Sequence, residues 1–347
     1  MFINSDRIIN YTKFDATMRL AQPKPVTSCN LLTAHQLFHV GDYFIILDFK
    51  AADGYFFQVF NNEMTYLSHF AGKGKGPGEF IAPSFSGSYY IDPNKKIYLW
   101  IFDTNLGKAF KIDLIKAIEN KGKGESYIVS FFELPKNHLL ISELHYFEKE
   151  NTAFARCDVN SNGLFLLFHP NSKQPYKWIE QDNFLNTKID SAYRGWAYMS
   201  TSRIDYKENL IISGMVFYEK LSFINAIGQT ILQSINTNNS KSLRSDFNQK
   251  TLNSFITYHS GMDLSENYVF VSGSRLTGTQ WYKTDNEDKT KMYIDVYSKE
   301  GKPLIQFICP GRFVSFCVDL KKSKIFAINN SKEDFVLWEY DIPTYLK

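Results

Sequence analysis

The sequence contains no long apolar run. No stretch of about 18 apolar residues occurs in the 347-residue chain, so no transmembrane helix is predicted. The first twenty residues, MFINSDRIINYTKFDATMRL, also lack the uninterrupted apolar segment of a secretory signal. Taken as it stands, the sequence predicts a cytoplasmic protein. A periplasmic or cell-surface location is the alternative if an export signal has been removed.

Cysteine is scarce, and neither sign of charge is in large excess. The four cysteines, Cys29, Cys157, Cys309 and Cys317, form no Cys-x-x-Cys pair and are expected to be small buried residues. A disulfide between Cys309 and Cys317 is the alternative. The 39 basic and 36 acidic residues give a net charge of +3, which is too balanced to favour nucleic acid or a membrane surface as a partner.

Motifs of familiar catalytic and metal sites are also missing. None of the seven histidines lies in an HExxH pattern, and neither a GxSxG nucleophile turn nor a DxDxDG calcium loop occurs. We therefore expect no metal ion and no cofactor, and we assign no catalytic residue.

Aromatic residues, by contrast, are abundant, and they accompany a degenerate repeat. The 30 Phe and 21 Tyr favour half-buried sheet surfaces. The repeating unit is a short strand that ends in a polar turn and is followed directly by a strongly apolar strand. Its six copies are VGDYFIILD (40–48), IDPNKKIYLW (91–100), ELPKNHLLISE (133–143), IDYKENLIISG (204–214), MDLSENYVFVSG (262–273) and VDLKKSKIFAIN (318–329).

The spacing of the copies predicts an all-β, six-bladed β-propeller. The apolar strands begin 42 to 71 residues apart, which is room for the four strands of one blade. Seven blades are the alternative, if the longest interval contains an extra blade between His169 and Tyr193. We expect one domain over residues 1–347, with a lead-in over 1–34 and blades near 35–71, 84–122, 126–170, 194–236, 255–309 and 312–342.

The sixth copy ends one strand short, at residues 336–342. An unpaired outer strand invites aggregation, so a ring of blades needs a strand to cover its last edge. Residues 7–14, RIINYTKF, are predicted to be that outer strand, which would close the ring.

A glycine-rich segment, GKGKGPGEFIAP, lies between the first two copies. It resembles the linker of NHL-repeat propellers and, more closely, the GxGPGEF element of the bacterial TolB-like six-bladed propeller family, whose members are largely uncharacterised and often exported. Alternating glycines allow close backbone approach, as a linker between blades requires. An anion site using Lys73 and Lys75 is the alternative, although a strand rather than a helix is expected to follow. The linker residues are Gly72, Gly74, Gly76, Pro77, Gly78, Glu79, Phe80 and Pro83.

Ligands of propellers generally meet one face near the axis, where innermost strands begin and second strands end. The repeat places ten candidate ligand-binding residues there, and this mixture of Arg, His, Trp and carboxylate suits a polar or anionic ligand. They are His35, Tyr127, Arg194, Trp196, His259 and Arg312 at the first position, and Asp48, Glu143, His145 and Arg275 at the second. A long insertion over 274–291 adds the aromatic pair Trp281 and Tyr282, a feature found in binding loops.

These observations favour a non-catalytic binding module, expected to be a monomer, that engages a protein, peptide or glycan at this face. The alternative is a hydrolase or lyase acting in the axial funnel. It would use His145 or His259 with Glu143 or Asp48 as acid and base.

Overall fold

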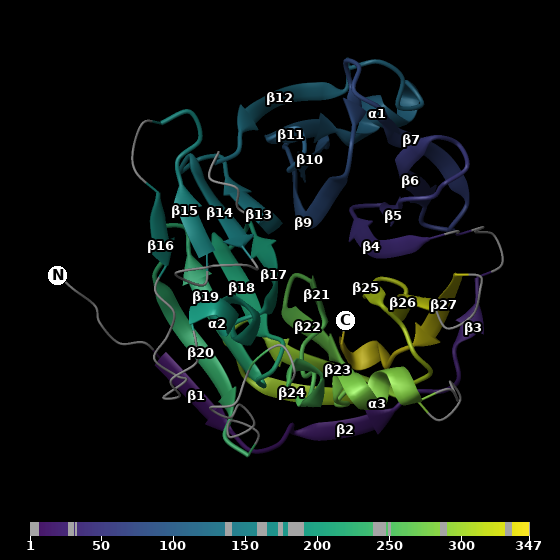
Figure 1. The fold of residues 1–347 in the computed structure, drawn as a ribbon. Coiled ribbons are helices and arrows are strands. Elements are labelled where there is room, and N and C mark those ends of the chain that lie inside the picture. Colours follow the sequence, from purple (N-terminus) through teal and green to yellow (C-terminus); the bar gives the residue numbers. More distant parts are fainter. Residues whose placement is uncertain are drawn as a thin grey trace.

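Six mainly antiparallel sheets surround a common axis in the computed structural model, and one edge strand of each sheet lies nearest the centre (Figure 1). This arrangement confirms the prediction of a six-bladed, all-β propeller. The structure describes residues 7–26, 31, 33–135, 141–157, 165–172, 176–179, 191–238, 248, 251–284, 290–329 and 335–346.

The first three blades follow one another along the chain. Blade 1 contains β4 (Ala34–Val40), β5 (Tyr43–Asp48), β6 (Tyr55–Asn61), β7 (Tyr66–Lys73) and the short β8 (Glu79–Phe80). Blade 2 contains β9 (Pro83–Ile91), β10 (Ile97–Asp103), β11 (Lys108–Asp113) and β12 (Ile128–Glu133), with α1 (Leu114–Glu119) before its last strand. Blade 3 contains β13 (Ile141–Phe147), β14 (Thr152–Cys157), β15 (Phe165–Phe168) and β16 (Lys177–Ile179).

The last three blades each gain an outer strand from the N-terminal segment. Blade 4 contains β17 (Ser200–Asp205), β18 (Leu210–Met215), β19 (Lys220–Asn225), β20 (Thr230–Asn236) and β1 (Arg7–Tyr11). Blade 5 contains β21 (Gly261–Leu264), β22 (Tyr268–Gly273), β23 (Lys291–Ser298), β24 (Pro303–Pro310) and β2 (Ala16–Arg19). Blade 6 contains β25 (Ser315–Asp319), β26 (Lys324–Asn329), β27 (Val336–Asp341) and β3 (Lys24–Pro25).

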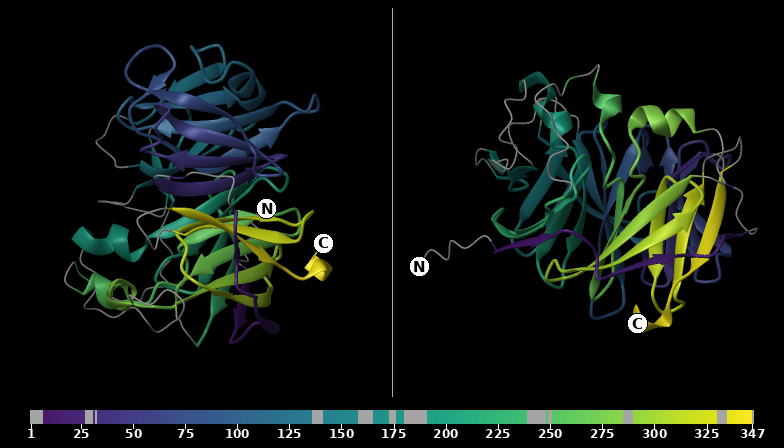
Figure 2. Two further views of the ribbon diagram at one scale, coloured as in Figure 1. Left: turned by 90° about the vertical axis from the view of Figure 1, so that its right-hand side faces the viewer. Right: turned by 90° about the horizontal axis from the view of Figure 1, so that it is seen from below.

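The closing strand is a different one from that predicted. Residues 7–14 do not join blade 6: β1 pairs in parallel with β20 of blade 4, and β2 pairs in parallel with β24 of blade 5. The outer strand of blade 6 is β3, which pairs antiparallel with β27. The N-terminal segment therefore follows the outside of three consecutive blades before β4 starts blade 1 (Figure 2).

From the sequence, the third repeat copy was also assigned to the wrong place in the blades. Its first strand, β12, pairs with β11 and is therefore the outermost strand of blade 2, not the innermost strand of blade 3. The polar segment PKNH of this copy therefore separates two blades along the chain rather than two strands of one blade, and most of it lies outside the described residues. Blade 3 begins at β13, whose partner β14 follows the turn Glu148–Asn151.

Aromatic and aliphatic side chains fill the spaces between blades. Phe38 of blade 1, for example, packs on Phe85 of blade 2 with ring centroids 4.5 Å apart. Cys309 and Cys317 lie in this buried interior as free thiols, so the alternative of a disulfide between them is wrong. Burial raises the pKa of the Cys309 thiol.

Side chains also join the innermost strands of neighbouring blades. An innermost strand has one edge without a strand partner, and its buried main-chain N–H groups need acceptors. At four interfaces a side chain from the preceding blade accepts such a hydrogen bond. The four pairs are Leu37 N to Ser315 Oγ, Leu144 N to Ser86 Oγ, Ser202 N to Glu143 Oε1, and Val318 N to Asp263 Oδ2.

Short helices lie on one face of the ring, where innermost strands begin (Figure 2). They are α2 (Ser191–Ala197), the 3-10 helix η1 (Leu252–Ser254) and α3 (Gly278–Lys283). We call this side the helical face, and the side where innermost strands end the opposite face. Another 3-10 helix, η3 (Thr344–Leu346), ends the chain. No helix in the described ranges is both long and apolar enough to cross a membrane.

Candidate functional site

Two of the ten predicted residues hold loops in place. The Tyr127 hydroxyl, fully buried, donates to Gly78 O at 3.1 Å and accepts from Ala71 N at 3.3 Å. Burial raises its pKa to about 12. Asp48 is also buried and accepts hydrogen bonds from the main chain and the hydroxyl of Thr33 and from Lys50 N. Both side chains therefore serve the packing of blade 1.

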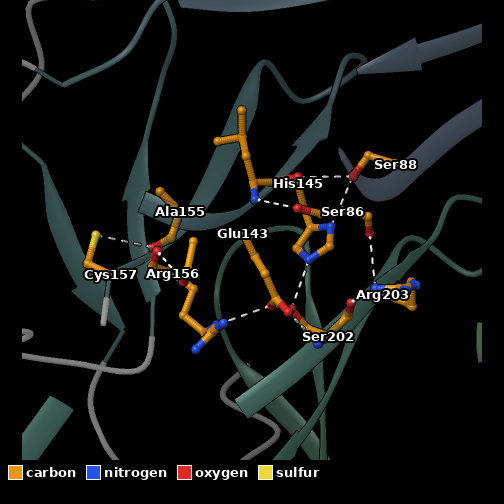
Figure 3. Close-up of polar contacts among 11 residues, drawn as sticks. Ser86, Ser88, Glu143, His145, Ala155, Arg156, Cys157, Ser202 and Arg203 are labelled. Atoms are coloured by element: carbon orange, nitrogen blue, oxygen red, sulfur yellow. Dashed lines mark hydrogen bonds and ion pairs between the residues drawn. The ribbon is translucent and has the colours of Figure 1, made fainter. Parts of the chain in front are cut away.

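His145 and Glu143 come together through a serine, as Figure 3 shows. His145 Nε2 lies 2.9 Å from Ser202 Oγ, and its Nδ1 lies 2.9 Å from Ser88 Oγ. Ser202 Oγ donates to Glu143 Oε2, and Arg156 Nε lies 3.2 Å from the same carboxylate oxygen. Because the one hydroxyl proton of Ser202 goes to Glu143, His145 Nε2 is the donor to Ser202.

This order differs from that of a hydrolase. A catalytic triad places the histidine between the acid and the serine, so that the serine proton passes to the ring. Here the serine stands between the histidine and the acid. His145 and Ser202 are also fully buried, and burial, with the charges of Arg203 and Arg156, lowers the pKa of His145 to about 3. With its ring neutral, His145 links the innermost strands of blades 2, 3 and 4 through hydrogen bonds to Ser88 and Ser202.

His259 and Arg275 lie at the interface of blades 4 and 5. His259 is fully buried, and burial and the nearby Arg275 guanidinium hold its pKa well below its usual value. Arg275 donates to Tyr258 O at 2.8 Å, lies 3.2 Å from Glu219 Oε1 and forms an ion pair with Asp295. The predicted acids are engaged elsewhere, since Glu143 contacts Ser202 and Arg156 and Asp48 contacts Thr33 and Lys50.

The remaining four candidates lie near the starts of innermost strands, on the helical face. Trp196 in α2 packs within an aromatic cluster that includes Phe217 and Phe255. The Arg312 guanidinium lies 3.7 Å from the centre of the Trp281 ring. Arg194 belongs to α2, but its side chain lies outside the described residues. His35, at the start of β4, is exposed beside Phe49.

The glycine-rich linker connects β7 to β9. Its Glu79 side chain folds back to accept from Gly76 N at 2.7 Å, and Phe80 is buried against Phe110 with centroids 4.9 Å apart. Gly78 has φ of +76°, and a Cβ there would lie 2.3 Å from Gly124 O. Only glycine fits this position without strain.

An apolar pocket of about 360 Å³ opens on the helical face, and we call it the aromatic pocket. Segments of blades 4, 5 and 6 form it together with η1 and α3. Its lining contains no Asp, Glu, Lys or Arg. Its larger side chains are Met199, Phe217, Leu252, Phe255, Trp281, Tyr282, Met292 and Phe313. Of the residues named from the sequence, Trp281 and Tyr282 line this pocket, and Arg312 supports it.

A second cavity, also of about 360 Å³, lies on the axis toward the opposite face, and we call it the axial pocket. Its lining includes Arg203 and Asp263 from innermost strands, which the sequence analysis did not select. The sequence carried no signal that singles out Asp263, because the fourth and sixth repeat copies also have an Asp as their second residue, Asp205 and Asp319.

Comparisons with known proteins identify the fold and no family. No protein-family model matches the sequence. No curated protein matches it. A member of the DUF4221 family from Bacteroides vulgatus ATCC 8482 is similar in structure, with 12% identity, a TM-score of 0.58, and coverage of 92% of this chain and 98% of that chain. A candidate exported protein from Bacteroides fragilis NCTC 9343 has 14% identity, a TM-score of 0.53, and coverage of 97% and 99%. At such identities the likeness shows the propeller fold alone.

Proposed function

We propose that this protein is a non-catalytic binding module that holds an apolar or aromatic side chain of a protein or peptide partner in the aromatic pocket. The observation that carries this proposal is the pocket itself, a concave aromatic surface on the helical face without a charged side chain in its lining. Buried aromatic anchors in such pockets supply most of the binding free energy of protein interfaces.

Exposure of the rim supports a partner of this kind. Tyr282 is 75% exposed although it borders an apolar pocket, and Val314 on the other rim is 36% exposed. Apolar surface gains about 25 cal/mol per Å² when it is removed from water, so a partner that covers these side chains gains affinity from them. Tyr and Trp also lose little conformational entropy on binding.

The pocket is largely held in shape before a partner arrives. Thr277 caps α3 by accepting from Gln280 N, and Gln280 Oε1 accepts from Thr277 N in return. Thr279 Oγ1 donates to Asn253 O at 3.1 Å, which ties α3 to η1. The Arg312 guanidinium stacks on Trp281, an arrangement that fixes the indole. Preorganised contacts reduce the entropy lost on binding.

Family, compartment and oligomeric state are further parts of this proposal. The GKGKGPGEF linker supports a relationship to TolB-like or NHL-like propellers. The similar structure from Bacteroides fragilis, a candidate exported protein, supports the periplasmic or cell-surface alternative to a cytoplasmic location. We propose that the chain binds as a monomer, with its apolar rim covered by the partner.

A displayed peptide library selected against the full chain tests the proposal. We expect the selected peptides to share an aromatic or large aliphatic residue. Replacing Tyr282 with Ala should weaken their binding about tenfold, because the side chain loses its contact area in the complex. Calorimetric titration of the tightest peptide gives the dissociation constants.

The control variant is Ile227→Ala, which removes an apolar side chain that is 64% exposed at the turn between β19 and β20. Its affinity for the same peptide should equal that of the unchanged chain. Equal affinity of the Tyr282→Ala variant, or selection only of charged peptides without a common apolar residue, would contradict the proposal. A glycan array run in parallel tests whether the pocket binds a glycan instead of a peptide, since sugar rings also stack on Trp and Tyr.

A further inference from the structure

The axial pocket is lined by equal numbers of cationic and anionic side chains. It lies between innermost strands of several blades and extends to their last residues, on the face away from the aromatic pocket. Six charged residues line it: Arg203, Asp205, Lys207, Asp263, Glu266 and Lys299.

Four of these six form ion pairs with one another. Lys299 Nζ lies 2.5 Å from Asp205 Oδ2, and Lys207 Nζ lies 2.7 Å from Glu266 Oε1. Arg203 and Asp263 remain, and among the described residues neither has an oppositely charged group within 4 Å. Arg203 and Asp263 therefore form no direct ion pair, although each lies within the electrostatic influence of the other.

Arg203 is held at the pocket wall by its neighbours. Its Nη1 donates to Ser202 O at 2.9 Å, and its guanidinium lies 5.2 Å from the centre of the Phe38 ring. Gly87 makes room for it, because a Cβ at Gly87 would lie 2.8 Å from Arg203 Cδ. Nε and Nη2 have no hydrogen-bond partner among the described residues, and Arg203 lines the axial pocket. Their N–H groups are available to a carboxylate.

Asp263 is positioned on the neighbouring innermost strand. Its Oδ2 accepts from Val318 N at 2.7 Å, and His39 Nδ1 lies 3.3 Å from Val318 O, so both side chains contact the main chain of the same residue. Burial raises the pKa of Asp263, and the charge of Arg203 opposes that rise. A carboxyl that loses hydration in this way is stabilised by a cation that enters the pocket.

We propose that the axial pocket binds a small zwitterion of the amino-acid class, with its carboxylate on Arg203 and its ammonium group on Asp263. Such a ligand is neutral overall, as is the remainder of the lining. Phe38, Tyr89 and Leu264 supply apolar surface for its side chain. This site is separate from the aromatic pocket and does not depend on the function proposed for it.

Calorimetric titration of the full chain with a panel of free α-amino acids, at up to about 10 mM, tests this inference. We expect at least one amino acid to bind. Its N-acetyl derivative and its methyl ester should each bind about tenfold more weakly or worse, because each loses one of the two charges. Acetate and methylammonium alone should show no saturable binding. A short peptide with free ends is titrated as well. Its two terminal charges are farther apart than those of a free amino acid, so the comparison shows which of the two the pocket binds.

Two variants assign the binding to this pocket. Asp263→Asn and Arg203→Gln should each weaken the amino acid about tenfold, whereas Tyr282→Ala should leave its affinity unchanged. If Arg203→Gln fails to fold, the ester and N-acetyl comparison on the unchanged chain still tests the recognition of both charges. Absence of binding by every amino acid, equal binding of the singly charged derivatives, or unchanged affinity in Asp263→Asn would overturn the inference. Arg203 and Asp263 would then form only a solvated, water-bridged pair.

Discussion

Polar side chains near the axis of this propeller mainly satisfy main-chain groups at the inner edges of the sheets. Glu143 accepts from Ser202 N, and Ser86 accepts from Leu144 N, in each case across a blade boundary. A buried N–H without an acceptor costs about 1–3 kcal/mol, so these contacts stabilise the ring. A polar residue on an innermost strand is therefore, taken by itself, weak evidence for a ligand site in this fold.

The buried His145 makes the stability of the protein depend on pH. Its folded-state pKa of about 3 lies below the unfolded value of about 6.5, so acid protonates the unfolded chain first. The stability associated with His145 is present above about pH 6.5 and is lost as the pH falls toward 3. Between pH 7.5 and 5.0 this group should remove about 2 kcal/mol from the free energy of unfolding. Urea unfolding at the two pH values measures the loss.

The matched variant is His145→Gln, which keeps a hydrogen-bonding side chain without a titrating group. Its loss of stability between the two pH values should be smaller by about 2 kcal/mol than that of the unchanged chain. The lowered pKa of His259 acts in the same direction in both proteins and cancels in the comparison. An identical pH dependence in both would show that His145 is not held neutral.

Strands and hairpins could be predicted wherever a polar turn is followed directly by an apolar strand. Copies such as IDPNKKIYLW contain a polar turn followed by alternating aliphatic and aromatic residues, and the structure forms a hairpin there, with Ile97 paired to Ile91. The third copy, ELPKNHLLISE, has the same local pattern but joins two blades. A segment between two blades and a turn within one blade can have similar amino-acid composition. Only the pairing of strands in the whole sheet distinguishes the two.

The path of the N-terminal segment could not be predicted from the same patterns. Residues 7–14 are apolar and β-branched enough to form an outer strand, as expected, but three blades offer an outer edge within reach. The choice of blade 4 depends on long-range contacts such as the pairing of β1 with β20 and the hydrogen bond from Asn238 Nδ2 to Thr12 O, 3.1 Å long. The residues of this hydrogen bond lie 226 positions apart and leave no local signal.

Deletion of residues 1–10 tests the role of β1 while keeping Tyr11. It removes four of the five residue pairs between β1 and β20, so the β20 amides should exchange with deuterium about tenfold faster or more. Strand β24 is the internal control, because β2 still covers it. Unchanged exchange in β20 together with faster exchange in β24 would contradict the observed pairing.

At the scale of the molecule, the ring presents two different faces. The helical face carries the aromatic pocket, without charged residues in its lining, and the axial pocket near the opposite face has three cations and three anions in its lining. Sequence reasoning selected the helical face and the Trp281–Tyr282 insertion, because a long aromatic loop departs visibly from the repeat. It did not select Arg203 and Asp263, because they lie inside regular strands and come together only where innermost strands converge.

The central claim is that a partner occupies the helical face. Hydrogen–deuterium exchange of the full chain, with and without saturating amounts of the tightest selected peptide, tests it most directly. We predict slower exchange over residues 251–284 and 310–314, which contain η1, α3 and the rim at Val314. Slower exchange confined to residues 203–207 and 263–266, or to the outer strands, would contradict the claim.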